Sequence, residues 1–127
     1  MTLDEVVKTV QGKVISADVD LSMEVSSAFG SDLLSDVLAF VHSETMLLTG
    51  LTNTQTVRTA EMAGITAILF VRGKYPPEQT VELAAEKGIP LLWSPHTMYE
   101  SCGRLYMAGL PSSKLLDLAA ERNAGRE

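Results

Sequence analysis

Three short apolar runs occupy the middle of the chain, and each is followed by a polar turn and a segment with helical periodicity. The runs cover residues 46–48, 67–71 and 89–93. Uninterrupted apolar strands are typical of a parallel sheet covered on both faces, and helices supply the crossovers that parallel strands need. The pattern predicts one α/β domain over residues 1–127, with a mainly parallel sheet between helices in three layers.

The N-terminal part predicts two helices and two strands. Residues 2–5 fit a capping box for a short helix, and residues 13–16 predict a short strand. Residues 23–29 alternate between apolar and polar side chains, which predicts a strand with one face in water. Ser31 is the expected cap of a second helix that begins at Asp32, where the helix dipole favours a carboxylate.

The helices that follow the three apolar runs have recognisable ends. Gly64 and Gly88 are expected to end the first two in the left-handed conformation, and Pro77 is expected to open the second. Gly50 is also expected to hold a backbone conformation that a side chain would strain. The side chains expected to face the core are Val57, Ala60, Ala63, Val81, Ala84, Ala85, Met98, Cys102 and Leu105. A last short helical segment is expected after Pro111.

Composition and charge argue against some kinds of partner and indicate a cellular compartment. The formal net charge of -6 argues against nucleic acid, whose phosphates would be repelled. The chain has one cysteine, an acidic N-terminus unlike a secretory signal, and no apolar run long enough to cross a bilayer. We therefore expect a cytoplasmic protein without a membrane partner.

The candidate chemistry lies where the predicted strands end. In open parallel sheets, ligands bind beyond the carboxyl ends of the strands, where helix N-termini offer free N–H groups. Two basic residues in that region suggest a small anionic ligand. The expected ligand-binding residues are Thr49, Gly50, Asn53, Arg72, Lys74, Ser94, His96 and Thr97. The plainer alternative is that the hydroxyl residues only cap helices and the two bases are solvated.

Several other residues have a functional and a structural interpretation. His96 is a candidate general acid–base or phosphate contact, although a surface histidine is the simpler explanation. Cys102 is expected to be a buried, inert thiol. Arg58 and Glu61 are spaced to pair on one helix, and either could instead reach Asp32 or Asp36. The sequence contains no Walker A loop, glycine-flanked serine or metal-binding spacing of cysteine and histidine, and it predicts no cofactor.

Residues 48–62, together with residues 31–41 and 88–92, resemble the DRTGG domain family. The motif that names the family is not spelled out in this chain. The family is similar to the N-terminal domain of HPr kinase/phosphorylase and occurs in phosphotransacetylases and fused to CBS domains. The resemblance implies the fold of that N-terminal domain. It also implies a non-catalytic regulatory module, often dimeric, without kinase activity.

These observations leave three hypotheses for function. The preferred one is a regulatory protein that binds a small anionic ligand, nucleotide- or phosphate-like, or a protein partner. The alternatives are a dimerisation module without a ligand and a small enzyme that uses His96. A homodimer is expected because apolar and aromatic residues gather around and after the last crossover helix, at Tyr99, Tyr106, Met107, Leu110, Leu115, Leu116 and Leu118.

Overall fold

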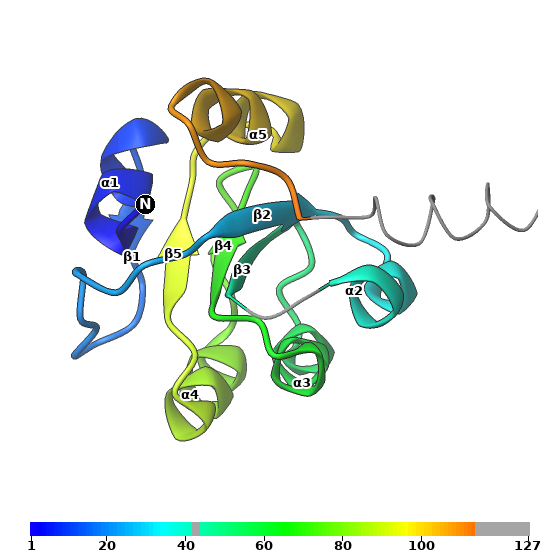
Figure 1. Ribbon diagram of the computed structural model, residues 1–127. Coiled ribbons are helices and arrows are strands. Elements are labelled where there is room, and N and C mark those ends of the chain that lie inside the picture. Colours follow the sequence, from blue (N-terminus) through cyan, green and yellow to red (C-terminus); the bar gives the residue numbers. More distant parts are fainter. Residues whose placement is uncertain (42–43, 114–127) are drawn as a thin grey trace, which may run out of the picture.

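The computed structural model of the chain describes residues 1–41 and 44–113. Within these residues, five strands form one sheet in the order β1-β5-β4-β3-β2 (Figure 1). Strands β2 to β5 are parallel, whereas β1 runs antiparallel to β5. The strands are β1 (Lys13–Val14), β2 (Ser27–Gly30), β3 (Thr45–Thr49), β4 (Ala67–Phe70) and β5 (Leu91–Trp93). The mainly parallel sheet predicted from the sequence is confirmed.

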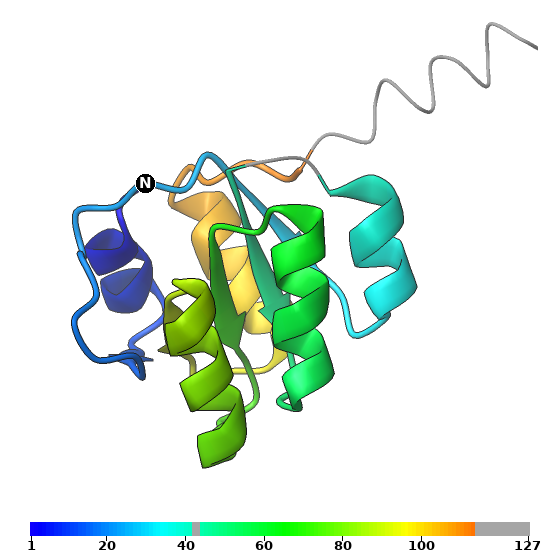
Figure 2. The same ribbon diagram turned by 90° about the horizontal axis from the view of Figure 1, so that it is seen from below.

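Helices cover both faces of this sheet, which confirms the three predicted layers. Helices α1 and α5 lie on one face, while α2, α3 and α4 lie on the other (Figures 1 and 2). The helices are α1 (Leu3–Thr9), α2 (Leu34–Phe40), α3 (Thr54–Ala63), α4 (Glu78–Lys87) and α5 (Met98–Met107).

The central strands supply side chains to both layers of the core. Met46 and Leu48 of β3 pack with the α1 and α5 residues, whereas Leu47 packs with the α3 and α4 residues. All residues of β3 and β4 are buried, so neither face of these strands tolerates a polar side chain without a partner. This double burial explains the uninterrupted apolar runs, and each large side chain contributes about 1.5–3 kcal/mol.

The helix ends follow the local chemistry of the sequence. Helices α3 and α4 end at Gly64 and Gly88, whose φ angles of 73° and 68° lie in the left-handed region. Pro77 is the N-cap of α4, and the capping box between Thr2 and Glu5 is present at α1. One inward assignment is wrong, because Ala85 is exposed on the outer side of α4.

The predicted strand over residues 23–29 is shorter than expected. Strand β2 begins only at Ser27, and the preceding residues are held by main-chain hydrogen bonds to the N-terminus, such as Val25 N–H to Met1 O at 2.9 Å. Val25 packs in the α1 and α5 core, but Phe29 packs in the opposite one. The polar residues Glu24 and Ser26 are exposed, as the alternation predicted. Within β2 itself, however, Ala28 and Phe29 pack in the two opposite cores, so this strand has no face in water.

The second helix also begins later than predicted, at Leu34 rather than Asp32. Ser31 Oγ accepts the N–H of Leu33 at 3.0 Å, so its hydroxyl closes a turn before the helix. Asp32 consequently lies in the loop between β2 and α2, and its carboxylate is free to contact another strand. The predicted segment after Pro111 lies mostly outside the described residues, with Leu115, Leu116 and Leu118 among those not described.

None of the described helices has the length and hydrophobicity that crossing a membrane requires.

Candidate functional site

Asp32 joins the ends of two parallel strands. Its Oδ1 accepts hydrogen bonds from Thr49 Oγ1 at 2.9 Å and from the Gly50 N–H at 2.7 Å. Thr49 Oγ1 in turn accepts the N–H of Leu51 at 3.1 Å. Hydrogen bonds to a carboxylate are roughly twice as strong as neutral ones, so this network fixes the loop after β3 at the carboxyl edge of the sheet.

Arg72 reaches the same place from the end of β4. A methyl group added at Gly50 would lie 2.6 Å from Arg72 Nη2 and 2.9 Å from Nε, so the guanidinium lies directly against the Gly50 backbone. The guanidinium of Arg72 can lie this close to the backbone only because Gly50 has no side chain. Our prediction of a strained backbone there is wrong, because its φ lies outside the left-handed region, in contrast to Gly64.

The backbone of Arg72 is itself unusual. Its φ of 65° places a bulky residue in the left-handed region, and its N–H donates to the His96 carbonyl at 2.7 Å. Such a conformation costs of order 1–3 kcal/mol and persists only where neighbouring structure enforces it. Within the described residues, no carboxylate lies within ion-pair distance of the Arg72 guanidinium. The arrangement holds an exposed cation at the edge of the sheet.

Two residues that were not among the predicted site residues, Tyr75 on the turn after β4 and Trp93 at the end of β5, form an aromatic pair. The rings of Tyr75 and Trp93 are stacked, with centroids 5.2 Å apart and an interplanar angle of 27°. Lys13 Nζ lies over the Trp93 ring, 5.2 Å from its centroid. Lys74 is exposed on the same turn as Tyr75. Arg72, Lys74 and Tyr75 thus share the turn after β4, while Trp93 at the end of β5 contacts both Tyr75 and Lys13.

His96 is held by both of its ring nitrogens. Nδ1 lies 2.7 Å from Glu100 Oε2, and Nε2 lies 3.2 Å from Gln11 Oε1. The ring therefore links the start of α5 to the turn after α1. This engagement does not favour a general acid–base, which needs a ring nitrogen directed at a substrate.

Four of the predicted ligand-binding residues are occupied by local structure. Thr49 and Ser94 are fully buried, which corrects their assignment, because neither hydroxyl is accessible to a ligand. Ser94 Oγ is hydrogen-bonded to Ser101 Oγ at 2.8 Å. Asn53 and Thr97 are the N-caps of α3 and α5 and accept N–H groups of those helices. The plainer interpretation proposed this role for Thr97.

The first turn of α5 does not offer an unopposed anion site. Glu100 stands in that turn and bonds both His96 and Arg104, with its Oε2 3.3 Å from Arg104 Nε. A carboxylate there satisfies the positive end of the helix dipole. The structure therefore brings together Gly50, Arg72 and Asp32, with exposed Lys74 on the adjoining turn, rather than all eight predicted residues.

Cys102 and the predicted ion pair belong to the scaffold. Burial raises the pKa of the Cys102 thiol, which lowers its thiolate fraction and agrees with an inert role. Glu61 pairs with Lys87 of α4 at 3.3 Å rather than with Arg58. Among the described residues, no three His, Cys, Asp or Glu side chains are grouped closely enough to hold a metal ion.

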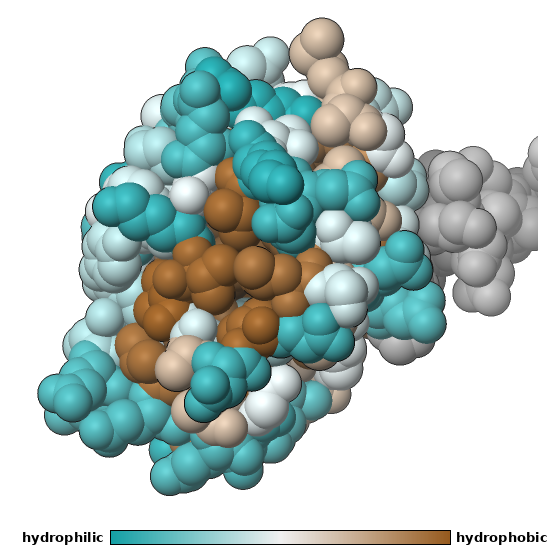
Figure 3. All heavy atoms as spheres, turned by 90° about the vertical axis from the view of Figure 1, so that its left-hand side faces the viewer, coloured by the Kyte–Doolittle hydropathy of each residue, from teal (hydrophilic) through white to brown (hydrophobic). Residues whose placement is uncertain are grey.

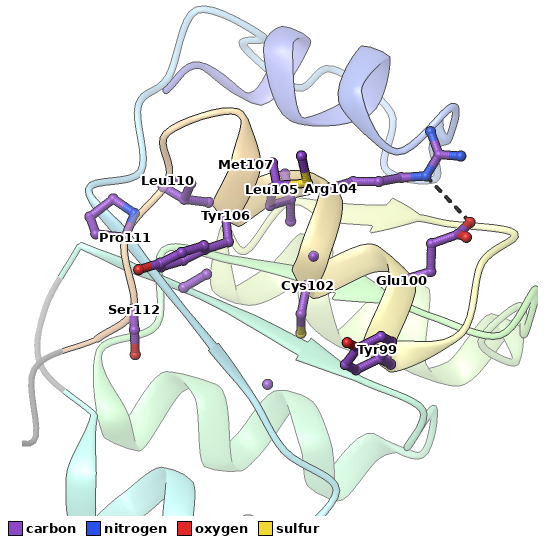
Figure 4. A pocket seen from close by; sticks show the side chains of 13 residues that line it. Tyr99, Glu100, Cys102, Arg104, Leu105, Tyr106, Met107, Leu110, Pro111 and Ser112 are labelled. Atoms are coloured by element: carbon purple, nitrogen blue, oxygen red, sulfur yellow. Dashed lines mark hydrogen bonds and ion pairs between the residues drawn. The ribbon is translucent and has the colours of Figure 1, made fainter.

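A second surface feature is an apolar groove of about 720 Å³ beside α5. Its rim carries Tyr99, Tyr106 and Met107, which are 89%, 70% and 90% exposed. In Figure 4, Tyr99 and Tyr106 project from α5 on either side of Cys102, and Pro111 and Ser112 form the facing wall. Leu110 belongs to the floor rather than the rim, because it is buried, which corrects its predicted exposure.

Another apolar surface lies on the side of the molecule that carries α1 and β1. Figure 3 shows apolar residues gathered in the middle of this face and surrounded by hydrophilic ones. The partly buried apolar residues of this region are Val7, Val14, Ile15, Val19 and Leu21.

Comparison with known families identifies the domain type. The family model of the DRTGG domain matches residues 5–108, which is most of the chain. This chain belongs to the DRTGG domain family. The family predicted from the sequence is confirmed, whereas its likeness to the HPr kinase N-terminal domain stays a prediction.

A solved structure shares the fold of this DRTGG domain. The crystal structure of the CBS and DRTGG domains of the regulatory region of Clostridium perfringens pyrophosphatase, complexed with its activator diadenosine tetraphosphate, matches with a TM-score of 0.71 and 15% identity. The match covers 88% of this chain and 48% of that one, so the DRTGG chain spans about half its length. No curated protein matches the chain.

Sequence reasoning missed Asp32, Tyr75 and Trp93 in this DRTGG domain. Asp32 follows the end of β2, so the rule for carboxyl ends would have included it if β2 had been placed in the parallel sheet. The aromatic pair had no comparable signal, because Tyr75 and Trp93 are 18 residues apart and meet only through the pairing of β4 with β5.

Proposed function

We propose that this DRTGG domain is a non-catalytic regulatory module that binds a small anionic ligand at the carboxyl edge of its sheet. The observation that carries the proposal is the Arg72 guanidinium, which is exposed, lies against the backbone of Gly50 and has no ion-pair partner among the described residues. The left-handed backbone of Arg72 costs stability, and such strained residues cluster at functional sites.

A regulatory role is supported by the family and by the chemistry of the site. The chain belongs to the DRTGG family, and a protein with the same fold is a regulatory region bound to a nucleotide activator. The edge offers a guanidinium, which can hold a phosphate through two parallel N–H bonds, and the exposed ammonium of Lys74. Both ring nitrogens of His96 are engaged, which counts against the alternative of a small enzyme.

The proposal is tested by ligand screening followed by one matched pair of variants. Thermal-shift measurements with pyrophosphate, AMP and ATP come first, because a ligand at about a hundred times its dissociation constant adds about 2.7 kcal/mol of stability. Arg72→Ala should weaken binding about tenfold or more, since it removes a charge-assisted contact. Arg58→Ala removes the same charge from the exposed side of α3 and should leave affinity unchanged. Affinity that ignores a combined Arg72 and Lys74 substitution would place the ligand elsewhere.

The exposed groove beside α5 supports a second component of the proposal, a homodimer. Tyrosine and methionine are enriched in interface cores, and a contiguous exposed apolar surface is unusual on a monomer. A two-fold axis would let one groove serve both subunits, which is the commonest arrangement. A dimer without any ligand is the competing function, and failure of every anion to bind would favour it.

A further inference from the structure

The turn after β4 carries aromatic and cationic groups on neighbouring residues. Arg72 and Gly73 both have left-handed φ angles, of 65° and 68°, so the chain turns sharply and places Tyr75 back over the end of β5. Main-chain bonds hold this turn, with Gly73 N–H donating to Ser94 O at 3.0 Å and Lys74 N–H to Val71 O at 3.4 Å. The ring of Tyr75 is therefore fixed at the end of β5, on the same turn as Arg72 and Lys74.

Trp93 supports the Tyr75 ring from behind. Trp93 lies opposite Lys13 in the pairing of β1 with β5, and Lys13 Nζ lies over the indole. With Trp93 packed against it, the Tyr75 side chain is still 54% exposed. A ring that is fixed on one side and open to solvent is pre-organised for stacking, because little side-chain entropy remains to be lost.

Only part of the aromatic stack is open to solvent. The indole N–H of Trp93 is buried and has no hydrogen-bond partner among the described residues. The exposed part of the stack is therefore the Tyr75 side chain, on the same turn as Arg72 and Lys74.

We propose that Tyr75 is the platform on which the base of a nucleotide stacks, with its phosphate bound by Arg72 and Lys74. This inference rests on the proposed anion site and names the class of ligand that it takes. A nucleotide joins an aromatic base to a phosphate through one sugar, and the turn presents a ring and two cations over four consecutive residues. Base stacking on an aromatic side chain tolerates any base, so Tyr75 sets the class of ligand rather than one sequence-specific base.

The test compares AMP with ribose 5-phosphate, which has the same sugar and phosphate but no base. Calorimetric titration of the full chain should show AMP binding about tenfold more tightly than ribose 5-phosphate, consistent with the size of one stacking interaction. Tyr75→Ala should remove this difference and leave ribose 5-phosphate affinity within about twofold, because the phosphate contacts stay in place. Tyr75→Phe should keep the difference, since the ring is what stacks.

Two further variants control for loss of stability and for the removal of an exposed tyrosine as such. Tyr75→Leu still covers Trp93 but lacks a ring, so it should behave as Tyr75→Ala does even if the alanine variant is unstable. Tyr99→Ala removes a tyrosine that is even more exposed, 89% against 54%, from α5, and should leave the affinities for AMP and ribose 5-phosphate unchanged. Trp93 is the only tryptophan, so its fluorescence should respond to AMP and not to ribose 5-phosphate.

The outcomes separate this inference from the proposed function. Equal affinity for AMP and ribose 5-phosphate, with dependence on Arg72, would overturn the stacking platform and leave the anion site. A Tyr75→Ala variant that weakens both ligands equally would show that Tyr75 only holds the turn, which also overturns it. An AMP preference that depends on Tyr75 but ignores Arg72 would support the platform and contradict the proposed anion site. No binding of either ligand at millimolar concentration would overturn both.

Discussion

The carboxyl edge of the sheet and the groove beside α5 are built in opposite ways. At the edge, polar groups contact one another in fixed directions, as in the two hydrogen bonds that Asp32 accepts from Thr49 and Gly50. At the groove, the exposed side chains are Tyr99, Tyr106 and Met107, which provide apolar contact area but few directional hydrogen bonds. Directional groups can select a small ligand, whereas exposed apolar area gains most when a large surface covers it.

The two regions also differ in how the chain makes them. The edge brings together residues from three separate strand ends, so it exists only when the sheet is formed. The rim of the groove comes from one helix, with the returning chain at Pro111 as its facing wall. Single substitutions at the edge should therefore change mainly the free energy of unfolding, whereas substitutions at the groove should change mainly the association of two chains.

The largest effect is expected from Tyr106→Asp at the groove. A charge in the centre of an apolar interface must be desolvated without a partner, so the homodimer should dissociate with a loss of about 2 kcal/mol or more. Light scattering coupled to size exclusion at tens of micromolar measures this as a change from dimer to monomer mass. A monomer mass for the unmodified chain would contradict the dimer itself.

Matched variants locate the interface if a dimer is present. Met62→Asp introduces the same charge at an exposed apolar residue of α3, 72% exposed, and should leave the dimer intact. Leu21→Asp introduces the charge in the loop between β1 and β2, on the side that carries α1, because the Leu21 carbonyl accepts the N–H of Asp4. A dimer that survives Tyr106→Asp but dissociates with Leu21→Asp would move the interface to that side.

An intermediate effect is expected from Asp32→Ala at the edge. The substitution removes an acceptor shared by the Thr49 hydroxyl and the Gly50 N–H, and Thr49 is fully buried. Because Asp32 is exposed, we expect a loss of about 1–2 kcal/mol rather than more, measured by denaturant unfolding. Asp36→Ala on α2 is the control and should cost no more than about 0.5 kcal/mol. Equal losses for the two variants would mean that the network at the strand ends contributes nothing specific.

The fold was predictable because its strongest signals are local. The apolar runs of β3, β4 and β5, the glycines at 64 and 88, and the capping box of α1 each depend on residues close together in the sequence. The start of strand β2 was harder to predict, because residues 23–26 alternate like a strand but precede β2, and hydrogen bonds hold them to the N-terminal segment. That misplacement concealed Asp32, since the end of β2 was not counted among the parallel strand ends.

The candidate site stays a prediction, and the structure bears only on which of its residues lie together. The rule for parallel sheets indicated the edge at which Gly50 and Arg72 lie in contact. Residue type alone could not separate hydroxyls that cap helices or fill the core, such as Thr97 and Ser94, from groups that face solvent. The stack of Tyr75 on Trp93 depends on the pairing of two strands and on a left-handed turn, neither of which a single sequence window contains.

The smallest expected effects come from one matched pair of substitutions, Gly50→Ala at the edge and Gly103→Ala on α5. Neither glycine has a left-handed φ, so an alanine fits the backbone at both positions. At Gly103 the new methyl group meets nothing within 4 Å, and alanine should stabilise the helix by about 0.5–1 kcal/mol because it loses less conformational entropy than glycine.

At Gly50 the methyl group would lie 2.6 Å from Arg72 Nη2, so the flexible end of the arginine must move away. Alanine lowers the conformational entropy of the unfolded chain, which stabilises the fold by about 0.4–1 kcal/mol. This should roughly offset that displacement, so the free energy of unfolding should change little. Affinity for an anion should nevertheless fall severalfold, since the guanidinium no longer occupies its position, whereas Gly103→Ala should leave affinity unchanged. Unfolding curves and calorimetric titrations of the two variants measure both quantities. Unchanged affinity in Gly50→Ala would mean that contact between Arg72 and Gly50 is incidental to binding.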